Sequence, residues 1–185
     1  LNIMQRLYEN HKVLTYPRTD SRYIGKDVAE TLKERLKACG VGPYRKIVGK
    51  LTVQPIRVNK SFVDDSKVSD HHAIIPTEQF VQLEYMTSDE RKIYDLVVRR
   101  FAAVLYPPCE YEQTTLKGIC GGEIFTAKGR RMKQPGWQAA YEDIVEDEAE
   151  DDIREQLLPE MKEGMTEPVR SVKINEGRTK PPAYY

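Results

Sequence analysis

Residues 14–23 read LTYPRTDSRY, and this stretch says most about both the fold and the function of the chain. It places the hydroxyl of Tyr16 close to two arginines, Arg18 and Arg22, with Pro17 restricting the backbone between them. Guanidinium groups are planar, permanently charged and matched in shape to phosphate oxygens. The stretch therefore suits the handling of a phosphodiester, although a surface turn with a packed tyrosine is an alternative that these residues alone leave open.

The chemistry of a tyrosine nucleophile explains why its neighbours matter. A phenol is a poor nucleophile near neutral pH because its pKa is about 10, so it needs a base or a nearby positive charge. Arg18 can stabilise the phenolate or the pentacoordinate phosphate of the transition state, or it can form a surface ion pair with Asp20. Thr19, Asp20 and Ser21 are expected to shape the turn through hydrogen bonds.

Two further stretches stand out, residues 69–77 (SDHHAIIPT) and 177–183 (GRTKPPA). Adjacent side chains of an extended segment point to opposite faces, so His71 and His72 are not expected to hold one metal ion together. A histidine that titrates near neutrality can contact phosphate or move a proton. A purely structural role stays open for both.

The three stretches occur in the order of known motifs: they resemble the active-site tyrosine motif, the histidine motif and the Thr-Lys-Pro-Pro stretch of type IA DNA topoisomerases. The form Tyr-Pro-Arg-Thr-Asp-Ser is similar to that of the bacterial topoisomerase III branch. The resemblance implies an isomerase that cleaves single-stranded DNA through a 5′-phosphotyrosine and passes DNA through a protein gate. It would then reseal the strand without ATP, giving decatenation and relaxation of negative supercoils.

The resemblance also implies roles for single residues. Tyr16 would be the nucleophile, Arg18 its electrostatic partner, and His71 the histidine placed near the reacting phosphate. We expect Thr19 and Asp20 to shape the site. The expected DNA contacts are Arg22, Ser21, Lys60 and His72.

Charge and cysteine content limit the class of protein. The 185 residues carry 29 basic and 29 acidic side chains, but residues 1–106 hold 18 basic against 13 acidic and residues 107–185 hold 11 against 16. The basic excess lies on the side of Tyr16, where it supports phosphate contacts. Three cysteines far apart make neither a disulfide framework nor a zinc site, which predicts a cytoplasmic protein, nucleoid-associated by the resemblance. No apolar run is long enough to cross a membrane.

Helical patterns dominate the first part of the chain. Apolar residues at helical spacing predict a helix from Asp27 to Gly40, and residues 44–51 could form another. Residues 87–90 form a capping box that opens the strongest predicted helix. Pro107 and Pro108 end that helix. Its expected buried stripe consists of Ile93, Leu96, Val97, Phe101, Val104 and Leu105, with Arg91, Lys92, Arg99 and Arg100 largely off it.

Beyond the prolines the pattern becomes alternating. Residues 111–119 and 123–128 predict a hairpin through Gly121-Gly122, and residues 167–174 predict a returning strand. Residues 142–160 hold ten carboxylates and one arginine. These acids lack a spaced ligand pattern, so a solvated loop is favoured over a magnesium site.

The predicted fold class is therefore an α+β multidomain fragment. Residues 1–106 form a mostly helical domain that carries Tyr16, and residues 107–185 form an incomplete β-rich domain. By the resemblance, the first contains a helix-turn-helix-like unit and the second links it to the rest of a ring. The chain opens on a helix-like stretch, which indicates a piece of a longer protein.

The expected cofactor and partners follow from the same comparison. The family's magnesium-binding acids and general acid lie in an N-terminal toprim domain, and no Asp-x-Asp cluster after a strand occurs here. We therefore expect Mg²⁺ in the full-length enzyme, no metal bound by this fragment, and no cleavage by the fragment alone. Its partners would be single-stranded DNA and the remaining domains of the parent chain, with no membrane and a monomeric state.

Two other classes of DNA protein make different predictions. A non-catalytic single-stranded DNA-binding module has no need of Tyr16, Arg18 and His71 together. A tyrosine recombinase would require an Arg-His-x-x-Arg constellation, and a plasmid relaxase a His-hydrophobic-His metal site, neither of which occurs.

Overall fold

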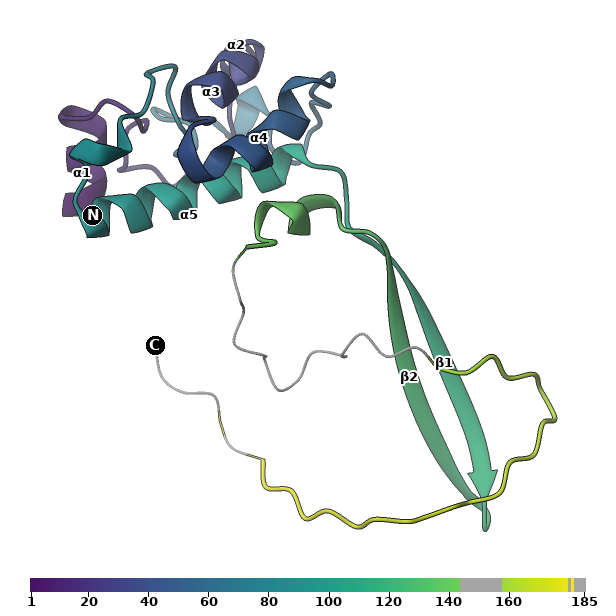
Figure 1. Cartoon of the computed structure of the whole chain (residues 1–185). Helices are drawn as coiled ribbons and strands as arrows, with labels where there is room; N and C mark the ends of the chain where they lie inside the picture. Colours follow the sequence, from purple (N-terminus) through teal and green to yellow (C-terminus); the bar gives the residue numbers. More distant parts are fainter. Residues whose placement is uncertain (144–157, 180, 182–185) are drawn as a thin grey trace.

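The chain folds into a helical body from which a long β-hairpin projects (Figure 1). The computed structural model describes residues 1–143, 158–179 and 181. Its helices are α1 (Asn2–Glu9), α2 (Lys26–Glu30), α3 (Leu32–Cys39), α4 (Arg45–Thr52) and α5 (Ser88–Leu105), its strands β1 (Glu110–Cys120) and β2 (Glu123–Gln134), and its short 3-10 turns η1 (Gly42–Tyr44), η2 (Asp65–Lys67), η3 (Leu83–Tyr85) and η4 (Gly136–Ala140). The α+β class is confirmed, whereas the helix-turn-helix-like unit stays a prediction.

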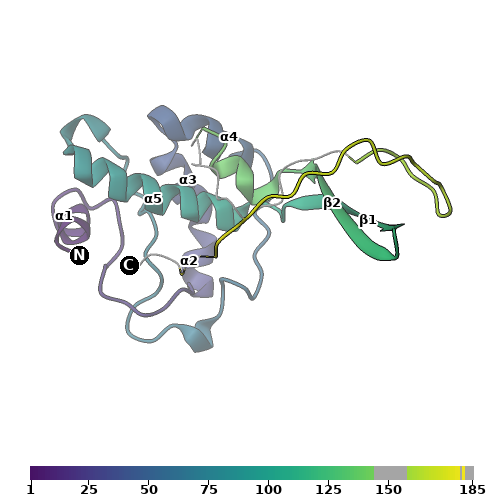
Figure 2. The same cartoon turned by 90° about the horizontal axis from the view of Figure 1, so that it is seen from below.

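Helix α5 is the support on which the helical body is built. In both views α1 lies near its first turns and the hairpin leaves from its other end (Figures 1 and 2). Tyr94, Val98 and Ala102 are fully buried at successive turns of α5, and α5 contacts both α1 and α4. Leu7, Leu14 and Leu36 complete the centre of the same core.

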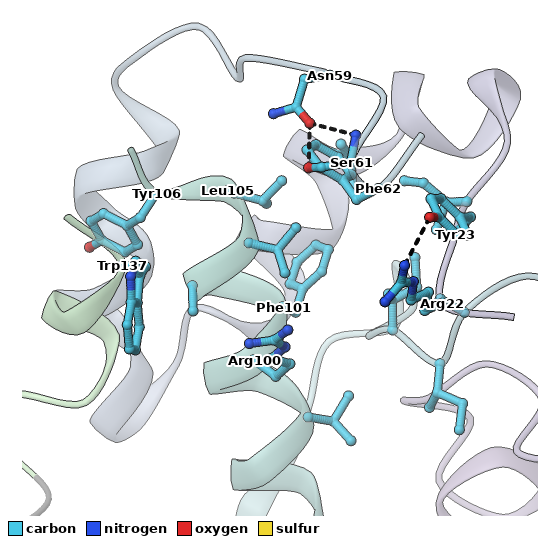
Figure 3. A pocket seen from close by; sticks show the side chains of 18 of the residues that line it. Arg22, Tyr23, Asn59, Ser61, Phe62, Arg100, Phe101, Leu105, Tyr106 and Trp137 are labelled. Atoms are coloured by element: carbon cyan, nitrogen blue, oxygen red, sulfur yellow. Dashed lines mark hydrogen bonds between the residues drawn. The ribbon is translucent and has the colours of Figure 1, made fainter. Parts of the chain in front are cut away.

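The predicted stripe of α5 is partly wrong. Phe101 and Leu105 are buried as expected, but Leu96 is 66% exposed and Arg99 is buried. Because α5 carries apolar residues around more than one face, periodicity alone does not determine which face is covered. The face of Arg100 forms one wall of a groove (Figure 3).

The predicted helix from Asp27 to Gly40 is broken at Thr31 into α2 and α3. The Thr31 hydroxyl donates a 2.8 Å hydrogen bond to the carbonyl of Val28 and accepts a 2.7 Å bond from Nε of Arg35. Threonine hydroxyls that bind nearby backbone compete with the helical ladder, which explains the break. The α4 helix agrees with its prediction.

The predicted capping box at the start of α5 is confirmed. The Thr87 hydroxyl accepts from the Glu90 amide at 3.3 Å, and the Glu90 carboxylate accepts from the Thr87 amide at 2.8 Å. Glu90 is 4% exposed, and it also binds Nε of Arg6 at 2.8 Å and lies 3.6 Å from Nε2 of His11. The cap therefore joins α1 to α5, and His11 is half-buried there.

We expect acid to weaken this joint. The Thr87 amide, with help from Arg6, lowers the pKa of Glu90 from its ordinary 4.5 to about 2. A depressed pKa stabilises the fold above the unfolded-state value, so this stabilisation is lost as the pH falls from about 4.5 to about 2. Urea unfolding across this range should show a steep acid loss that Glu90→Gln flattens. The exposed control Glu84→Gln should keep the original profile, and an unchanged profile in Glu90→Gln would contradict the assignment.

The hairpin is confirmed, and its turn explains its register. Gly121 and Gly122 both have positive φ angles, 58° and 87°, which suits a two-residue hairpin turn. The strands then pair antiparallel with Ile119 opposite Ile124, and most of their side chains are exposed.

The predicted strand at residues 167–174 is wrong, because the described residues 158–179 contain no strand. Alternation predicts which side chains share a face, but a strand also needs a partner edge to pair with. Of the acidic run 142–160, residues 144–157 lie outside the described residues. Glu142 pairs with Lys46 at 3.4 Å, and Asp143 pairs with Arg99.

The base of the hairpin is fixed to α5 by close packing and by charge. Gly136 has a φ of 52°, and a Cβ there would overlap the backbone of Pro107 and Pro108.

Arg99 is 5% exposed because its guanidinium binds Asp95 and Asp143 and donates 2.9 Å to the carbonyl of Ala140. The Asp95 contact lies within α5, so the contacts of Arg99 with Asp143 and with the Ala140 carbonyl are those that hold η4 and the residues after it against α5. The division into domains at residues 106 and 107 stays a prediction.

Candidate active site

The tyrosine motif (residues 14–23) and the histidine motif (residues 69–77) lie side by side, although they are far apart in sequence. Leu14 and Pro76 form an antiparallel bridge. The Thr15 amide donates to the carbonyl of Ile75, and the Thr77 amide donates to the carbonyl of Val13, both at 3.0 Å. A short ladder thus brings the tyrosine segment next to the histidine segment.

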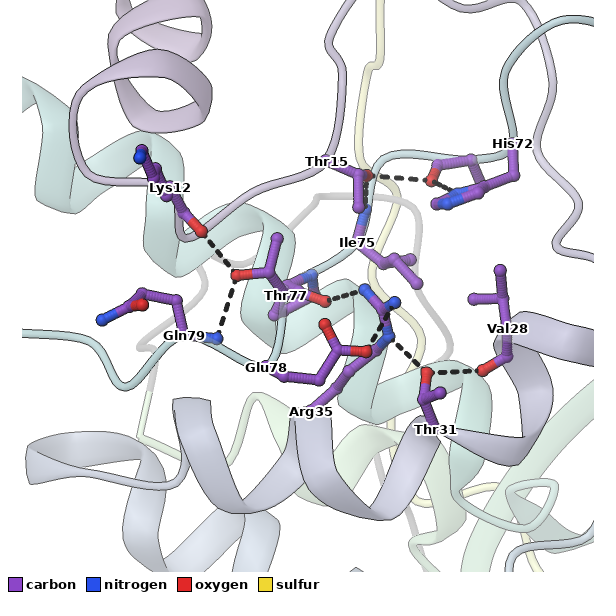
Figure 4. A network of polar contacts seen from close by, with 12 residues as sticks. Lys12, Thr15, Val28, Thr31, Arg35, His72, Ile75, Thr77, Glu78 and Gln79 are labelled. Carbon is purple, nitrogen blue, oxygen red and sulfur yellow. Dashed lines mark hydrogen bonds and ion pairs between the residues drawn. The ribbon is translucent and has the colours of Figure 1, made fainter.

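Threonine side chains strengthen this ladder (Figure 4). The Thr15 hydroxyl donates to the carbonyl of Ala73 at 3.2 Å and accepts from the Ile75 amide at 3.0 Å. The Thr77 hydroxyl donates to the carbonyl of Lys12 at 2.6 Å. Lys12 has a φ of 57°, a strained value for a lysine, so this bond holds the turn that leads into the tyrosine segment.

Arg35 on α3 anchors the histidine segment from below (Figure 4). Its guanidinium donates to the carbonyl of Pro76 at 2.9 Å and pairs with Glu78 at 2.8 Å. Burial lowers the pKa of Arg35, while Glu78 opposes that effect. A nearly buried arginine that satisfies a proline carbonyl fixes the segment to the helical core.

Tyr16 lies between two rings. The ring of His71 is 4.2 Å away between centroids with an interplanar angle of 38°. On α1, the ring of Tyr8 meets Tyr16 edge-on at 5.4 Å and 81°. Such contacts restrict an aromatic side chain beyond what burial alone does, and they leave Tyr16 half-exposed.

The residues that follow Tyr16 divide into one support and two exposed charges. The Thr19 hydroxyl donates to the carbonyl of His71 at 3.0 Å and accepts from the Ser21 amide at 3.1 Å. Arg18 and Asp20 are both exposed, and the described part of the chain provides neither an ion pair between them nor another bond to either. The Arg18 guanidinium therefore stays available for a ligand anion.

A second cluster surrounds Tyr23. Arg22 donates to the Tyr23 hydroxyl at 3.3 Å and Lys67 donates at 3.4 Å, with the Lys67 ammonium 4.6 Å from the ring centroid. The bond from Arg22, with that from Lys67, lowers the pKa of Tyr23. The Ser21 hydroxyl donates to the carbonyl of Lys67 at 2.8 Å, so it is used within the protein.

His72, Lys60 and the 177–183 motif, the remaining predicted contacts, make no hydrogen bond or ring contact with Tyr16 in the described structure. His72 is half-buried, with Nδ1 2.7 Å from the carbonyl of Ala73. Lys60 is exposed in a turn between Asn59 and Ser61. The 177–183 motif lies partly outside the described residues. The sequence did not reveal Tyr8, Arg35 and Lys67, because their contacts join elements far apart in the chain.

Among residues 1–143 and 158–179, no three His, Cys, Asp or Glu side chains gather in a group that could hold a metal. No helix of the described chain has the length and apolar character needed to cross a bilayer.

Comparison with known proteins places the chain in one family. Residues 1–185 match the profile of a family described as DNA topoisomerase. The chain is 58% identical over 186 residues to DNA topoisomerase 3 of Bacillus anthracis, covering 100% of this chain and 26% of that protein. Proteins of the same name from Bacillus licheniformis and Bacillus subtilis are 49% and 47% identical, each with 100% of this chain covered and 25% of the relative. The chain thus spans about a quarter of the length of these relatives.

Proposed function

The chain belongs to the DNA topoisomerase family, as a type IA, topoisomerase III-like fragment, and from this membership we propose that it carries the nucleophile of the parent enzyme. The parent cleaves one strand of DNA, passes DNA through the opening and reseals the strand. The observation that supports this most directly is the packing of Tyr16 against His71, with an exposed Arg18 two residues further on.

The proposed reaction is a transesterification. The hydroxyl oxygen of Tyr16 loses its proton as it attacks phosphorus, the bond to the 3′ oxygen breaks, and that oxygen takes up a proton and leaves as a hydroxyl, so the protons balance. The product is a 5′-phosphotyrosine ester, so the bond energy is kept and resealing needs no ATP. Arg18 stabilises the negative charge that develops on the phosphate. His71 contacts the phosphate or takes part in proton movement, two roles that a pH profile separates.

The remaining parts of the proposal rest on the family membership and on the chain covering about a quarter of its relatives' length. Magnesium would be held by carboxylates elsewhere in the parent, so no step here depends on it. We propose that the fragment alone does not cleave DNA, that it works as part of a monomer with the parent's other domains, and that its substrate is single-stranded DNA in the bacterial cytoplasm. Arg22 and Lys60 are proposed backbone contacts, and residues 1–106 and 107–185 are proposed as separate domains.

A covalent adduct tests the proposal. The full-length parent is incubated with a labelled single-stranded oligonucleotide and magnesium, quenched with denaturant and mapped by mass spectrometry. A 5′-phosphate on Tyr16 supports the proposal. A 3′ linkage overturns it, and tight strand binding without any adduct favours a non-catalytic binding module.

We expect Arg18→Ala in the full-length parent to lower the rate of adduct formation by roughly 10²–10³-fold, because a charge aimed at the reacting phosphate is removed. Arg18→Lys should restore part of the rate, since it returns the charge without the planar fork. Arg57→Ala removes an exposed arginine elsewhere and should leave the rate unchanged. Equal rates for Arg18→Ala and Arg57→Ala would show that Arg18 has no such role.

A further inference from the structure

A groove runs along the exposed face of α5, from the residues after Tyr16 to the base of the hairpin. Its volume is about 1090 Å³, and we call it the Arg100 groove. Its walls come from α5, from residues 19–24, from the turn at residues 59–62 and from η4 (Figure 3). Residues 73–75 of the histidine motif also line it, so segments distant in sequence form one surface.

The charge of the Arg100 groove is of one sign. Its lining includes Arg22 and Arg100, both exposed, and within the described chain it includes no aspartate or glutamate. The whole chain carries 29 basic and 29 acidic residues, so the overall composition does not explain a lining without acids. Asp20 lies next to Arg22 in the adjoining hollow, outside the groove. Two guanidinium groups in a lining without carboxylates suit a polyanion.

The apolar part of the lining suits nucleic-acid bases. Trp137 is 44% exposed and is braced edge-on by Tyr141 at 6.2 Å, while Leu96 on α5 is 66% exposed. Tyr23 stands at the other end beside Arg22. Aromatic rings interleaved with cations bind single strands by stacking, without preference for sequence. Asn59 and Ser61 add polar groups between the two ends.

We propose that the Arg100 groove holds the DNA strand on the 3′ side of the cut, the strand that Tyr16 would hold by its 5′ end. This inference rests on the proposed function. The groove begins at Thr19, whose hydroxyl also binds the carbonyl of His71, so it starts next to the nucleophile. A strand covalently attached to Tyr16 begins at the surface that carries Tyr16, and within the described residues this acid-free groove starts at that surface.

The test compares two substrates in the full-length parent. Both oligonucleotides share the sequence upstream of the cut, and their downstream arms have about 3 and about 12 nucleotides, since a single-strand site spans about 4–16. Arg100→Gln and Trp137→Leu should each weaken binding and adduct formation with the long arm by about tenfold, the size expected for one lost stacking or phosphate contact. Adducts with the short arm should stay at the wild-type level. Lys92→Gln, an exposed cation on α5 outside the groove, should affect neither substrate.

The outcomes separate this inference from the proposed function. If wild type forms no adduct with either substrate, both fail together. If wild type forms adducts and the variants lower adduct formation equally with both substrates, or with neither, only the groove inference fails. An equal loss would indicate that the substituted residues pack against another domain of the parent. A second measurement needs no variant: photo-crosslinking from 5-iodouracil in the long downstream arm should label Trp137 or Tyr23. Labels found only outside the groove would overturn the inference.

Discussion

Replacing Tyr16 by phenylalanine is expected to abolish covalent adduct formation by the full-length parent, with a loss of at least roughly 10³-fold. The substitution removes one oxygen and keeps the ring, so the contacts with His71 and Tyr8 persist. The fold should therefore survive while the reaction is lost. Adducts are counted on denaturing gels after a labelled oligonucleotide is mixed with magnesium and enzyme.

Tyr8→Phe is the matched control for this experiment. It removes the same oxygen from the ring that lies edge-on to Tyr16, and it should form adducts at close to the wild-type rate. Single-strand binding should stay near wild type in both variants. A normal adduct level in Tyr16→Phe would exclude Tyr16 as the nucleophile and would shift attention to another hydroxyl.

The second large effect concerns the support under the site. Arg35→Met keeps much of the side-chain volume but removes the donors to Pro76 and Thr31 and the partner of Glu78. It leaves a buried carbonyl unsatisfied, so we expect the free energy of unfolding to fall by about 3 kcal/mol. Because Pro76 pairs with Leu14, the loosened segment also releases His71 from Tyr16.

Urea unfolding of the chain measures the first consequence, and adduct yield in the full-length parent measures the second. Lys37→Met, on the same helix with an exposed side chain, is the matched control and should change stability by less than about 0.5 kcal/mol. Similar unfolding curves for Arg35→Met and Lys37→Met would show that the Arg35 network contributes little.

Features set by local chemistry could be predicted from the sequence. The capping box at Thr87 and Glu90 and the turn at Gly121-Gly122 depend on a few adjacent residues, and both are confirmed. Features that depend on distant partners could not. Arg99 is buried only because Asp143 and the carbonyl of Ala140 return to it, and nothing in the helical period of α5 indicates that.

The candidate site shows the same division. Tyr16, Arg18 and His71 stood out from their motifs, and the proximity of Tyr16 to His71 agrees with that reading, while their roles stay predictions. The residues that bring them together were not recognised, because Arg35 and Tyr8 act through contacts across the fold. The predicted strand at 167–174 failed for a related reason: its pattern was present, but no partner strand lies beside it among the described residues.

The fixed base of the hairpin has a mechanical consequence. A strand the length of β1 reaches about 35 Å, and its inner end is held where Gly136 rests on the two prolines and Arg99 binds Asp143. We therefore expect a force applied at the outer end to be transmitted to α5 through the contacts of Gly136 and Arg99. The hairpin would then act as a lever on the helix that supports the tyrosine segment.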